Sequence, residues 1–168
     1  RWRFASEMPS SLSSIVKERL SRRCRSSLTD FAKHALAPLG QSPAAHHQLL
    51  IDHLEAITRR DILRLMVFMP PGSAKSTYTS VVYPAYVMGR RPGSRVILGS
   101  YASSIAWKQS RRTRQIVSSQ KYRTIFGTGL VAGNRAVAGG IVAAFVVGPG
   151  IASRLFIQIL LSRLDRKS

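Results

Sequence analysis

A lysine and two hydroxyl residues follow a short loop of small residues, and they are the side chains in this chain best suited to bind phosphate. The segment reads Met69-Pro-Pro-Gly-Ser-Ala-Lys-Ser-Thr77. We expect Lys75 to lie against the β- and γ-phosphates of ATP, and the Ser76 hydroxyl to bind Mg²⁺. The small residues keep the loop slim, so that main-chain N–H groups reach anionic oxygens. The residues predicted to bind the nucleotide are Gly72, Ser73, Ala74, Lys75, Ser76 and Thr77, and Ser76 is also the predicted metal ligand.

The loop departs at two positions from the usual phosphate-binding pattern G-x-x-x-x-G-K-[ST]. Met69 and Ala74 stand where that pattern has glycine, and only the Lys-Ser pair is kept. A Pro-Pro-Gly turn with a surface lysine is the alternative interpretation. The context favours a phosphate loop, because a strand before it, a helix after it and a second apolar strand form a βαβ unit.

Three elements are expected to position this loop. The nearly continuous apolar run 61–69 predicts a strand buried on both faces. A helix is predicted over 76–89, with a kink or an early stop because Pro84 lies inside it. The apolar run 95–101 predicts the second strand. Together they indicate an α/β fold with a partial P-loop NTPase core.

Helices are expected before this core. Residues 10–25 predict an amphipathic basic helix, either a solvated arm or an arm that docks DNA or a partner. A short helix is predicted over 31–36, capped by Thr29-Asp30 and ended by Pro38 and Gly40. A longer amphipathic helix is predicted over 46–60.

The charge of the chain indicates a polyanionic partner. Lys and Arg number 26 against 7 Asp and Glu, which gives a formal net charge of +19. Nucleic acid is the expected partner, with an acidic membrane surface next. The helix predicted from Ser103 or Ser104 to about Ser118 contains no acid, and its basic residues either contact DNA phosphates or form a solvated face. The residues predicted to bind nucleic acid are Lys108, Arg111, Arg112 and Arg114.

Four segments together resemble the start of the ATPase of tailed-phage terminase large subunits. They are the loop itself, Tyr83-Pro-Ala-Tyr86, Gly89-Arg-Arg-Pro92 and Val96-Ile-Leu-Gly-Ser-Tyr101, within a resemblance that spans about 27–137. A loop with proline and alanine is familiar in that group. The resemblance implies ATP and Mg²⁺ as cofactors, and double-stranded DNA, the portal and the small terminase subunit as partners of the intact parent. It also implies a location in the cytoplasm of a bacterial host cell.

The resemblance also draws attention to the segment around His46, His47 and Gln48, where an adenine-contacting glutamine can occur. Gln48 is able to hydrogen-bond an adenine edge with both of its amide functions. The alternative is an exposed helical glutamine. The histidines are interpreted as surface or packing residues.

The acidic residues that hydrolysis needs are missing from the expected places. No Asp or Glu occurs between Asp61 and Asp165. An ATPase of this class needs an Asp that holds Mg²⁺ through water and a Glu that activates the attacking water. The resemblance also implies a C-terminal nuclease in the parent, and the clustered carboxylates that its two metal ions need are missing as well. We therefore expect no catalytic residues here and little or no activity from this chain alone.

The end of the chain does not continue the resemblance. Residues 136–153 are uncharged and rich in Gly, Ala and Val, and their glycines make a poor membrane helix, so stable membrane association is not expected. The alternatives are a truncated or frameshifted terminase and a lineage-specific ending. The single cysteine, Cys24, excludes an intramolecular disulfide.

The sequence thus predicts three parts: a basic helical lead-in over 1–44, an incomplete P-loop ATPase core over 45–130, and an apolar and basic tail over 131–168. The expected function is that of the N-terminal ATP-binding fragment of a terminase large subunit, whose parent moves DNA into procapsids. The alternative is a non-enzymatic basic nucleic-acid-binding protein with a vestigial P-loop.

Overall fold

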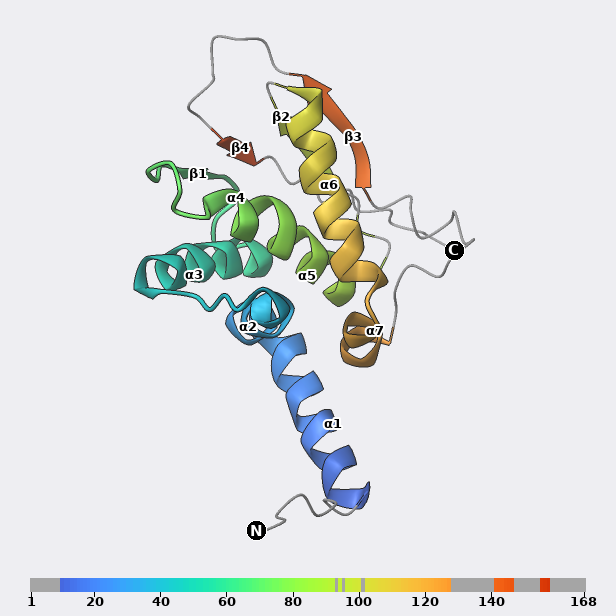
Figure 1. The fold of residues 1–168 in the computed structure, drawn as a ribbon. Helices are drawn as coiled ribbons and strands as arrows, with labels where there is room; N and C mark the ends of the chain where they lie inside the picture. The colour runs from blue at the N-terminus through green and yellow to red at the C-terminus, as the bar shows by residue number, and fades with distance from the viewer. Residues whose placement is uncertain are drawn as a thin grey trace, which may run out of the picture.

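The computed structural model describes residues 10–92, 94, 96–100, 102–127, 141–146 and 155–157. The described part of the chain is predominantly helical, with short strands at one end (Figure 1). The helices are α1 (Ser10–Ser26), α2 (Leu28–Leu36), α3 (Ala45–Arg59), α4 (Lys75–Thr77), α5 (Tyr83–Arg90), α6 (Ser103–Ser118) and α7 (Gln120–Phe126). The strands are β1 (Leu65–Val67), β2 (Val96–Ser100), β3 (Ile141–Val146) and β4 (Leu155–Ile157).

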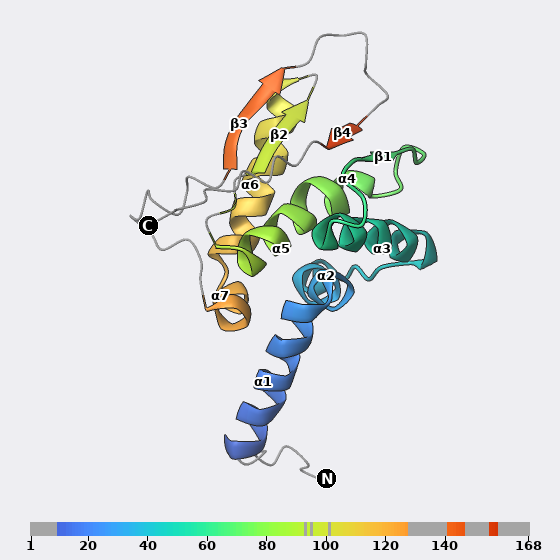
Figure 2. The same ribbon diagram turned by 180° about the vertical axis from the view of Figure 1, so that it is seen from behind.

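An aromatic cluster holds the helices together. The Phe31 ring of α2 lies 5.6 Å from the Tyr86 ring of α5 and 5.5 Å from the Phe126 ring of α7. The buried hydroxyl of Tyr122 donates to the carbonyl oxygen of Ala85 at 2.8 Å. The predicted lead-in therefore shares one core with α5 and α7, while the N-terminal part of α1 extends away from the body (Figures 1 and 2).

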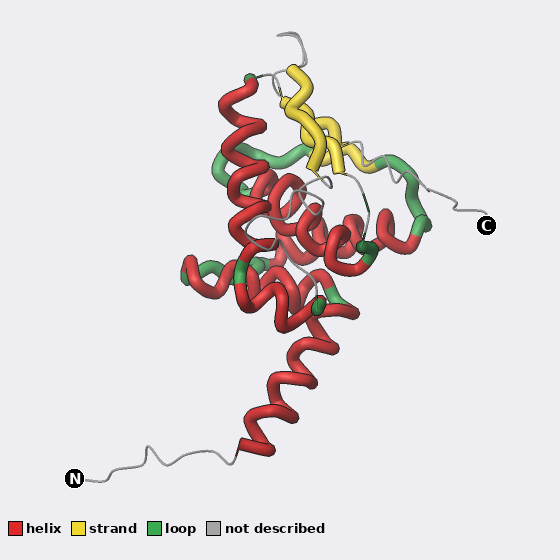
Figure 3. The backbone as a smooth tube through the Cα atoms, turned by 90° about the vertical axis from the view of Figure 1, so that its right-hand side faces the viewer, coloured by secondary structure: helices red, strands yellow, loops and turns green. Residues whose placement is uncertain are grey.

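The strands form two small sheets rather than one. β1 pairs with β4 in antiparallel orientation, and β2 pairs with β3 in parallel orientation with a register shift between Ile97 and Leu98. Figure 3 shows these strands together at the end of the molecule opposite α1. The predicted order of strand, loop, helix, strand and helix is observed, but the described residues contain no sheet in which β1 and β2 are hydrogen-bonded neighbours.

The prediction that the first strand is buried on both faces is wrong. β1 contains three residues, and the side chains on one of its faces are exposed, with Met66 at 45% and the following Phe68 at 66%. Val67, on the other face, is buried. The reason is that β1 pairs with the short β4 at the rim of the molecule, so only one face meets the helical core.

The predicted early stop at Pro84 does not occur. The chain stays helical from Lys75 to Arg90, and it passes through a π-helical segment, η2 (Tyr78–Val82), just before the proline. The N–H of Tyr83 donates to the carbonyl oxygen of Tyr78, five residues earlier. This wider turn gives the proline ring room, and Pro84 then occupies the first turn of α5, where its missing N–H costs little.

The other predicted helices are found, but their caps differ from the prediction. α2 begins earlier than predicted, and its cap is Ser27, whose Oγ accepts from the N–H of Asp30 at 3.3 Å. α6 begins after Ala102, which provides no side-chain cap, instead of after a serine. α3 ends at Arg60, which adopts φ +72°.

The predicted tail, 131–168, lies largely outside the described residues. Its described segments are β3 and β4, which pair with β2 and β1. Among the helices that the structure describes, none combines the length and the hydropathy that crossing a bilayer requires.

Candidate phosphate-binding site

The loop 68–74 connects the end of β1 to the start of α4, and Lys75 is the first residue of that helix. The Nζ atom of Lys75 donates to the carbonyl oxygen of Met69 at 2.7 Å. The lysine side chain therefore folds back over the loop and joins the start of α4 to the beginning of the loop. This is the strand-to-helix junction at which the sequence predicts a phosphate-binding lysine.

Two residues of the loop have left-handed backbone conformations. Gly72 has φ +82° and Ala74 has φ +52°. Between them, Ser73 closes a turn, since its N–H and its Oγ both donate to the carbonyl oxygen of Pro70, at 3.3 and 2.7 Å. Left-handed residues next to helical ones turn successive N–H groups toward one side, which is a common way to make an anion-binding concavity.

The left-handed conformation has a cost at Ala74 that it does not have at Gly72. A Cβ added at Gly72 would meet no atom within 4 Å, but an L side chain at positive φ costs about 1–2 kcal/mol relative to glycine. Ala74 carries that cost, so the surrounding contacts must hold it in place. Backbone strain of this kind is frequent at functional sites.

Several main-chain amides of the loop are available to a ligand. The N–H groups of Thr77 and Tyr78 donate to the carbonyl oxygen of Ala74, at 2.8 and 3.3 Å. Among the described residues, no acceptor is found for the N–H groups of Gly72, Ala74, Lys75 and Ser76. These amides and the Lys75 ammonium are the donors that a phosphate would need.

The predicted metal ligand occupies the first turn of the same helix. Ser76 follows Lys75 directly and is partly exposed. No group of three His, Cys, Asp or Glu side chains suitable for a metal ion is found among the described residues. Mg²⁺ bound here would take one hydroxyl from Ser76 and its other ligands from phosphate oxygens and water, which is the ligand set that Mg²⁺ tolerates well.

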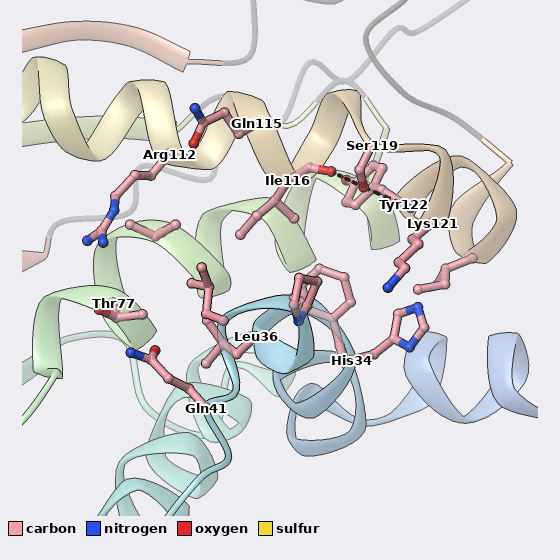
Figure 4. Close-up of a pocket in the computed structure, with 16 residues that line it drawn as sticks. His34, Leu36, Gln41, Thr77, Arg112, Gln115, Ile116, Ser119, Lys121 and Tyr122 are labelled. Atoms are coloured by element: carbon pink, nitrogen blue, oxygen red, sulfur yellow. Dashed lines mark hydrogen bonds between the residues drawn. The ribbon is translucent and has the colours of Figure 1, made fainter.

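A cavity of about 460 Å³ begins beside the loop, between α2, α4, α6 and α7 (Figure 4). Thr77, the residue after the Lys-Ser pair, lines one end together with Gln41 and Arg112. Lys121 and His34 lie toward the other end. Apolar side chains also line it, among them Phe31, Leu36, Val81 and Ile116. Its volume is in the range of sites that hold small organic ligands.

The polar lining of this cavity is basic. Its lining residues include Arg112, Lys121 and His34 and no carboxylate. Burial lowers the pKa of His34, and the nearby Lys121 adds to this shift, so both favour the neutral imidazole. An anionic or neutral ligand therefore fits this cavity better than a cation.

Gln48 is not among the residues lining the cavity. Its amide nitrogen donates to Thr29 Oγ1 at 2.8 Å and to Asp52 Oδ1 at 2.9 Å, which joins α3 to α2. The predicted contact of Gln48 with adenine stays a prediction. Gln41, to which the sequence assigns no role, is the glutamine placed next to Thr77.

His47, which the sequence analysis interprets as a surface or packing residue, contacts the phosphate loop. It belongs to the first turn of α3, and its Nε2 lies 3.0 Å from the carbonyl oxygen of Ser73 in the loop. The sequence offered one signal. Pro43 disfavours a helix in the residue before it, and His47 lies three residues after Ala44, in what would be the first turn of a helix that starts there. That pattern predicts a helix start, but not which distant segment the ring contacts.

The basic residues predicted to bind nucleic acid all lie exposed on α6. They are Lys108, Arg111, Arg112 and Arg114. The opposite face of the helix is buried through Ala106, Ser110, Thr113 and Val117. Trp107, which is 59% exposed, shares a face with Arg111 and Arg114 by its helical spacing. Arg112 differs from the other three because it also lines the cavity.

Neither the protein-family models, nor the curated proteins, nor the solved structures include a match to this chain.

Proposed function

We propose that this protein binds ATP with Mg²⁺, and that it corresponds to the N-terminal ATP-binding region of a phage terminase large subunit, the motor that packages DNA. The observation that supports this best is the arrangement around Lys75. Its ammonium lies across a loop whose amides at Gly72, Ala74, Lys75 and Ser76 have no acceptor among the described residues. Donors of this kind at the start of a helix are suited to a polyphosphate.

In this proposal Lys75 exchanges its contact with the Met69 carbonyl for the β- and γ-phosphates. The loop amides bind the phosphate oxygens, and Mg²⁺ supplies charge neutralisation between those phosphates when it is bound. Thr77 links the phosphate site to the adjoining cavity, so the nucleoside extends from the loop toward Gln41 and Arg112. An α/β P-loop core is the fold that this proposal implies.

Hydrolysis is not part of the activity proposed for this chain alone. The residues between Asp61 and Asp165 include no carboxylate that could orient the attacking water. In the intact parent, hydrolysis would drive double-stranded DNA into a procapsid, with the portal and the small terminase subunit as partners, in the cytoplasm of the bacterial host.

The proposal is tested by titrating Mg-ATP into the protein by calorimetry, with the Lys75→Ala variant and a Lys33→Ala control. Lys33 is an exposed lysine on α2 and not a member of the site. We expect binding to weaken by tenfold or more, about 1.4 kcal/mol, in Lys75→Ala and to stay unchanged in the control. Equal affinity in all three proteins would refute nucleotide binding by the loop.

A second function is favoured by the exposed basic face of α6. The protein would then be a non-enzymatic nucleic-acid-binding protein whose phosphate loop is vestigial. Four cationic side chains and an exposed tryptophan on one helix are suited to phosphates and stacked bases. DNA binding that is indifferent to ATP and to Lys75→Ala, together with undetectable ATP binding, would favour this function over the first.

A further inference from the structure

The His47 ring is held at both of its nitrogens. The N–H of Ala44 donates to Nδ1 at 3.1 Å, so Nδ1 is an acceptor. The proton of a neutral imidazole is then on Nε2, which lies 3.0 Å from the carbonyl oxygen of Ser73 and donates to it. The start of α3 thus fixes the tautomer that can bind the phosphate loop.

Ring contacts hold the imidazole in place from the sides. The Tyr78 ring lies 4.5 Å from the His47 ring with an interplanar angle of 30°, and Tyr78 is buried. The His46 ring lies 3.9 Å away on the same helix. His47 therefore contacts the chain on both sides of the Ala74-Lys75 step, at Ser73 and at Tyr78.

The direction of the Ser73 carbonyl determines the direction of the next amide. A trans peptide unit is planar, and its C=O and N–H point in opposite directions. Because the Ser73 oxygen faces His47 and α3, the N–H of Ala74 faces the other side of the loop. This N–H has no acceptor in the described part of the chain.

The same peptide unit sets the strained conformation of Ala74. Rotating the unit between Ser73 and Ala74 changes the φ of Ala74, which is +52°. Relaxation of Ala74 to negative φ would turn its N–H away from its present direction. A contact that holds the Ser73 carbonyl opposes this rotation.

We propose that His47 is a positioning residue for the phosphate loop: by holding the Ser73 carbonyl it keeps the Ala74 N–H turned toward a bound phosphate. This inference rests on the proposed nucleotide binding. The ligand class is the polyphosphate group itself, because the peptide unit that His47 holds belongs to the loop and not to the adjoining cavity.

The experiment compares the binding of inorganic tripolyphosphate to the wild-type protein and to three variants. His47→Ala removes the donor, and His47→Gln places an amide N–H at a similar reach from the backbone. His53→Ala is the matched control, because His53 is an exposed histidine of the same helix whose Nδ1 lies 2.8 Å from the carbonyl oxygen of Leu49, and it has no hydrogen bond to the loop in the described structure. Circular dichroism establishes a temperature at which all four proteins are folded.

We expect His47→Ala to weaken tripolyphosphate binding by about tenfold, His47→Gln to recover most of the loss, and His53→Ala to match the wild type. A purely structural role would lower the melting temperature without this pattern of rescue. Wild-type affinity in folded His47→Ala would overturn the role of His47 while leaving phosphate binding intact. No tripolyphosphate binding by the wild type would overturn both proposals.

Discussion

The hydroxyl of Thr113, on α6, lies 3.2 Å from the carbonyl oxygen of Ser80, which is the acceptor that Pro84 cannot use because it has no N–H. The two residues come from different helices, and Thr113 is fully buried. The same hydroxyl lies 3.1 Å from the carbonyl oxygen of Gln109 on its own helix. Thr113 has one hydroxyl proton and therefore donates to one of these carbonyl oxygens at a time, and its contact with Ser80 offers a donor at the turn where Pro84 has none.

Thr113→Val is expected to lower the free energy of unfolding by about 1–3 kcal/mol, because the shape is kept while a buried carbonyl loses its donor. Urea unfolding followed by circular dichroism measures the change. Thr124→Val serves as the control, since the Thr124 hydroxyl is exposed and donates within its own helix to Gln120. A loss no larger than in the control would show that Thr113 does not compensate for the proline.

Gly89→Ala is expected to destabilise the fold by about 1–3 kcal/mol through overpacking. A Cβ at Gly89 would lie 2.5 Å from atoms of the Phe126 ring, and this ring is part of the aromatic core. The same substitution in a Phe126→Ala background should cost much less, because the ring is gone. Additive losses in the double variant, measured by thermal unfolding, would contradict the close packing of α5 on α7.

These two contacts illustrate what the sequence could and could not predict. Helices over 10–25 and 46–60 were predicted from amphipathic spacing, which is a local property of the chain, and the structure has them at Ser10–Ser26 and Ala45–Arg59. A helix starting at Ser76 was predicted from the phosphate-loop pattern, which is also local, and it starts one residue earlier, at Lys75. The π-helical turn was not predicted, and the contact that it makes with Thr113 joins residues thirty-three positions apart in the chain.

The sequence predicted only those residues of the candidate site that are consecutive in the chain. The residues 72–77 lie together because they are consecutive. His47, Gln41 and Arg112 reach the site only through tertiary packing around α4. His47 comes from α3, Gln41 from the segment that follows α2, and Arg112 from α6. The short β1 also depends on tertiary structure, because its partner strand β4 lies far away in the sequence. Val67, for example, pairs with Leu155.

The stability of the protein should fall as the pH rises from 9 toward 11. Burial raises the pKa of the Cys24 thiol from 9.0 to about 11, and Asp30 adds to the shift. The native state therefore keeps its proton where the unfolded state has lost it, so this contribution is complete below pH 9 and is lost on going to pH 11. It amounts to about 1–3 kcal/mol.

Urea unfolding of the wild type and of Cys24→Ala across this pH range tests the thiol's contribution. The buried tyrosines Tyr83, Tyr86 and Tyr122, whose pKa values burial also raises, remain in both proteins. The difference between the two proteins therefore isolates Cys24. Parallel curves would show that the thiol does not contribute.

Arg111→Gln with Arg114→Gln is expected to weaken the binding of double-stranded DNA, if α6 contacts its phosphates. Each lost phosphate contact should lower the slope of log affinity against log salt by about 0.9. Lys33→Gln with Lys17→Gln removes the same charge from exposed positions on other helices and controls for net charge. Equal losses in both double variants, measured by fluorescence anisotropy at several salt concentrations, would assign binding to the overall charge rather than to α6.

The most direct test of phosphate binding by the loop is an NMR titration of the ¹⁵N-labelled protein with inorganic tripolyphosphate. The account predicts that the amide signals of Gly72, Ala74, Lys75 and Ser76 move first and saturate together, and that Lys75→Ala abolishes this response. Shifts confined to the basic residues of α6, with the loop amides unchanged, would contradict it.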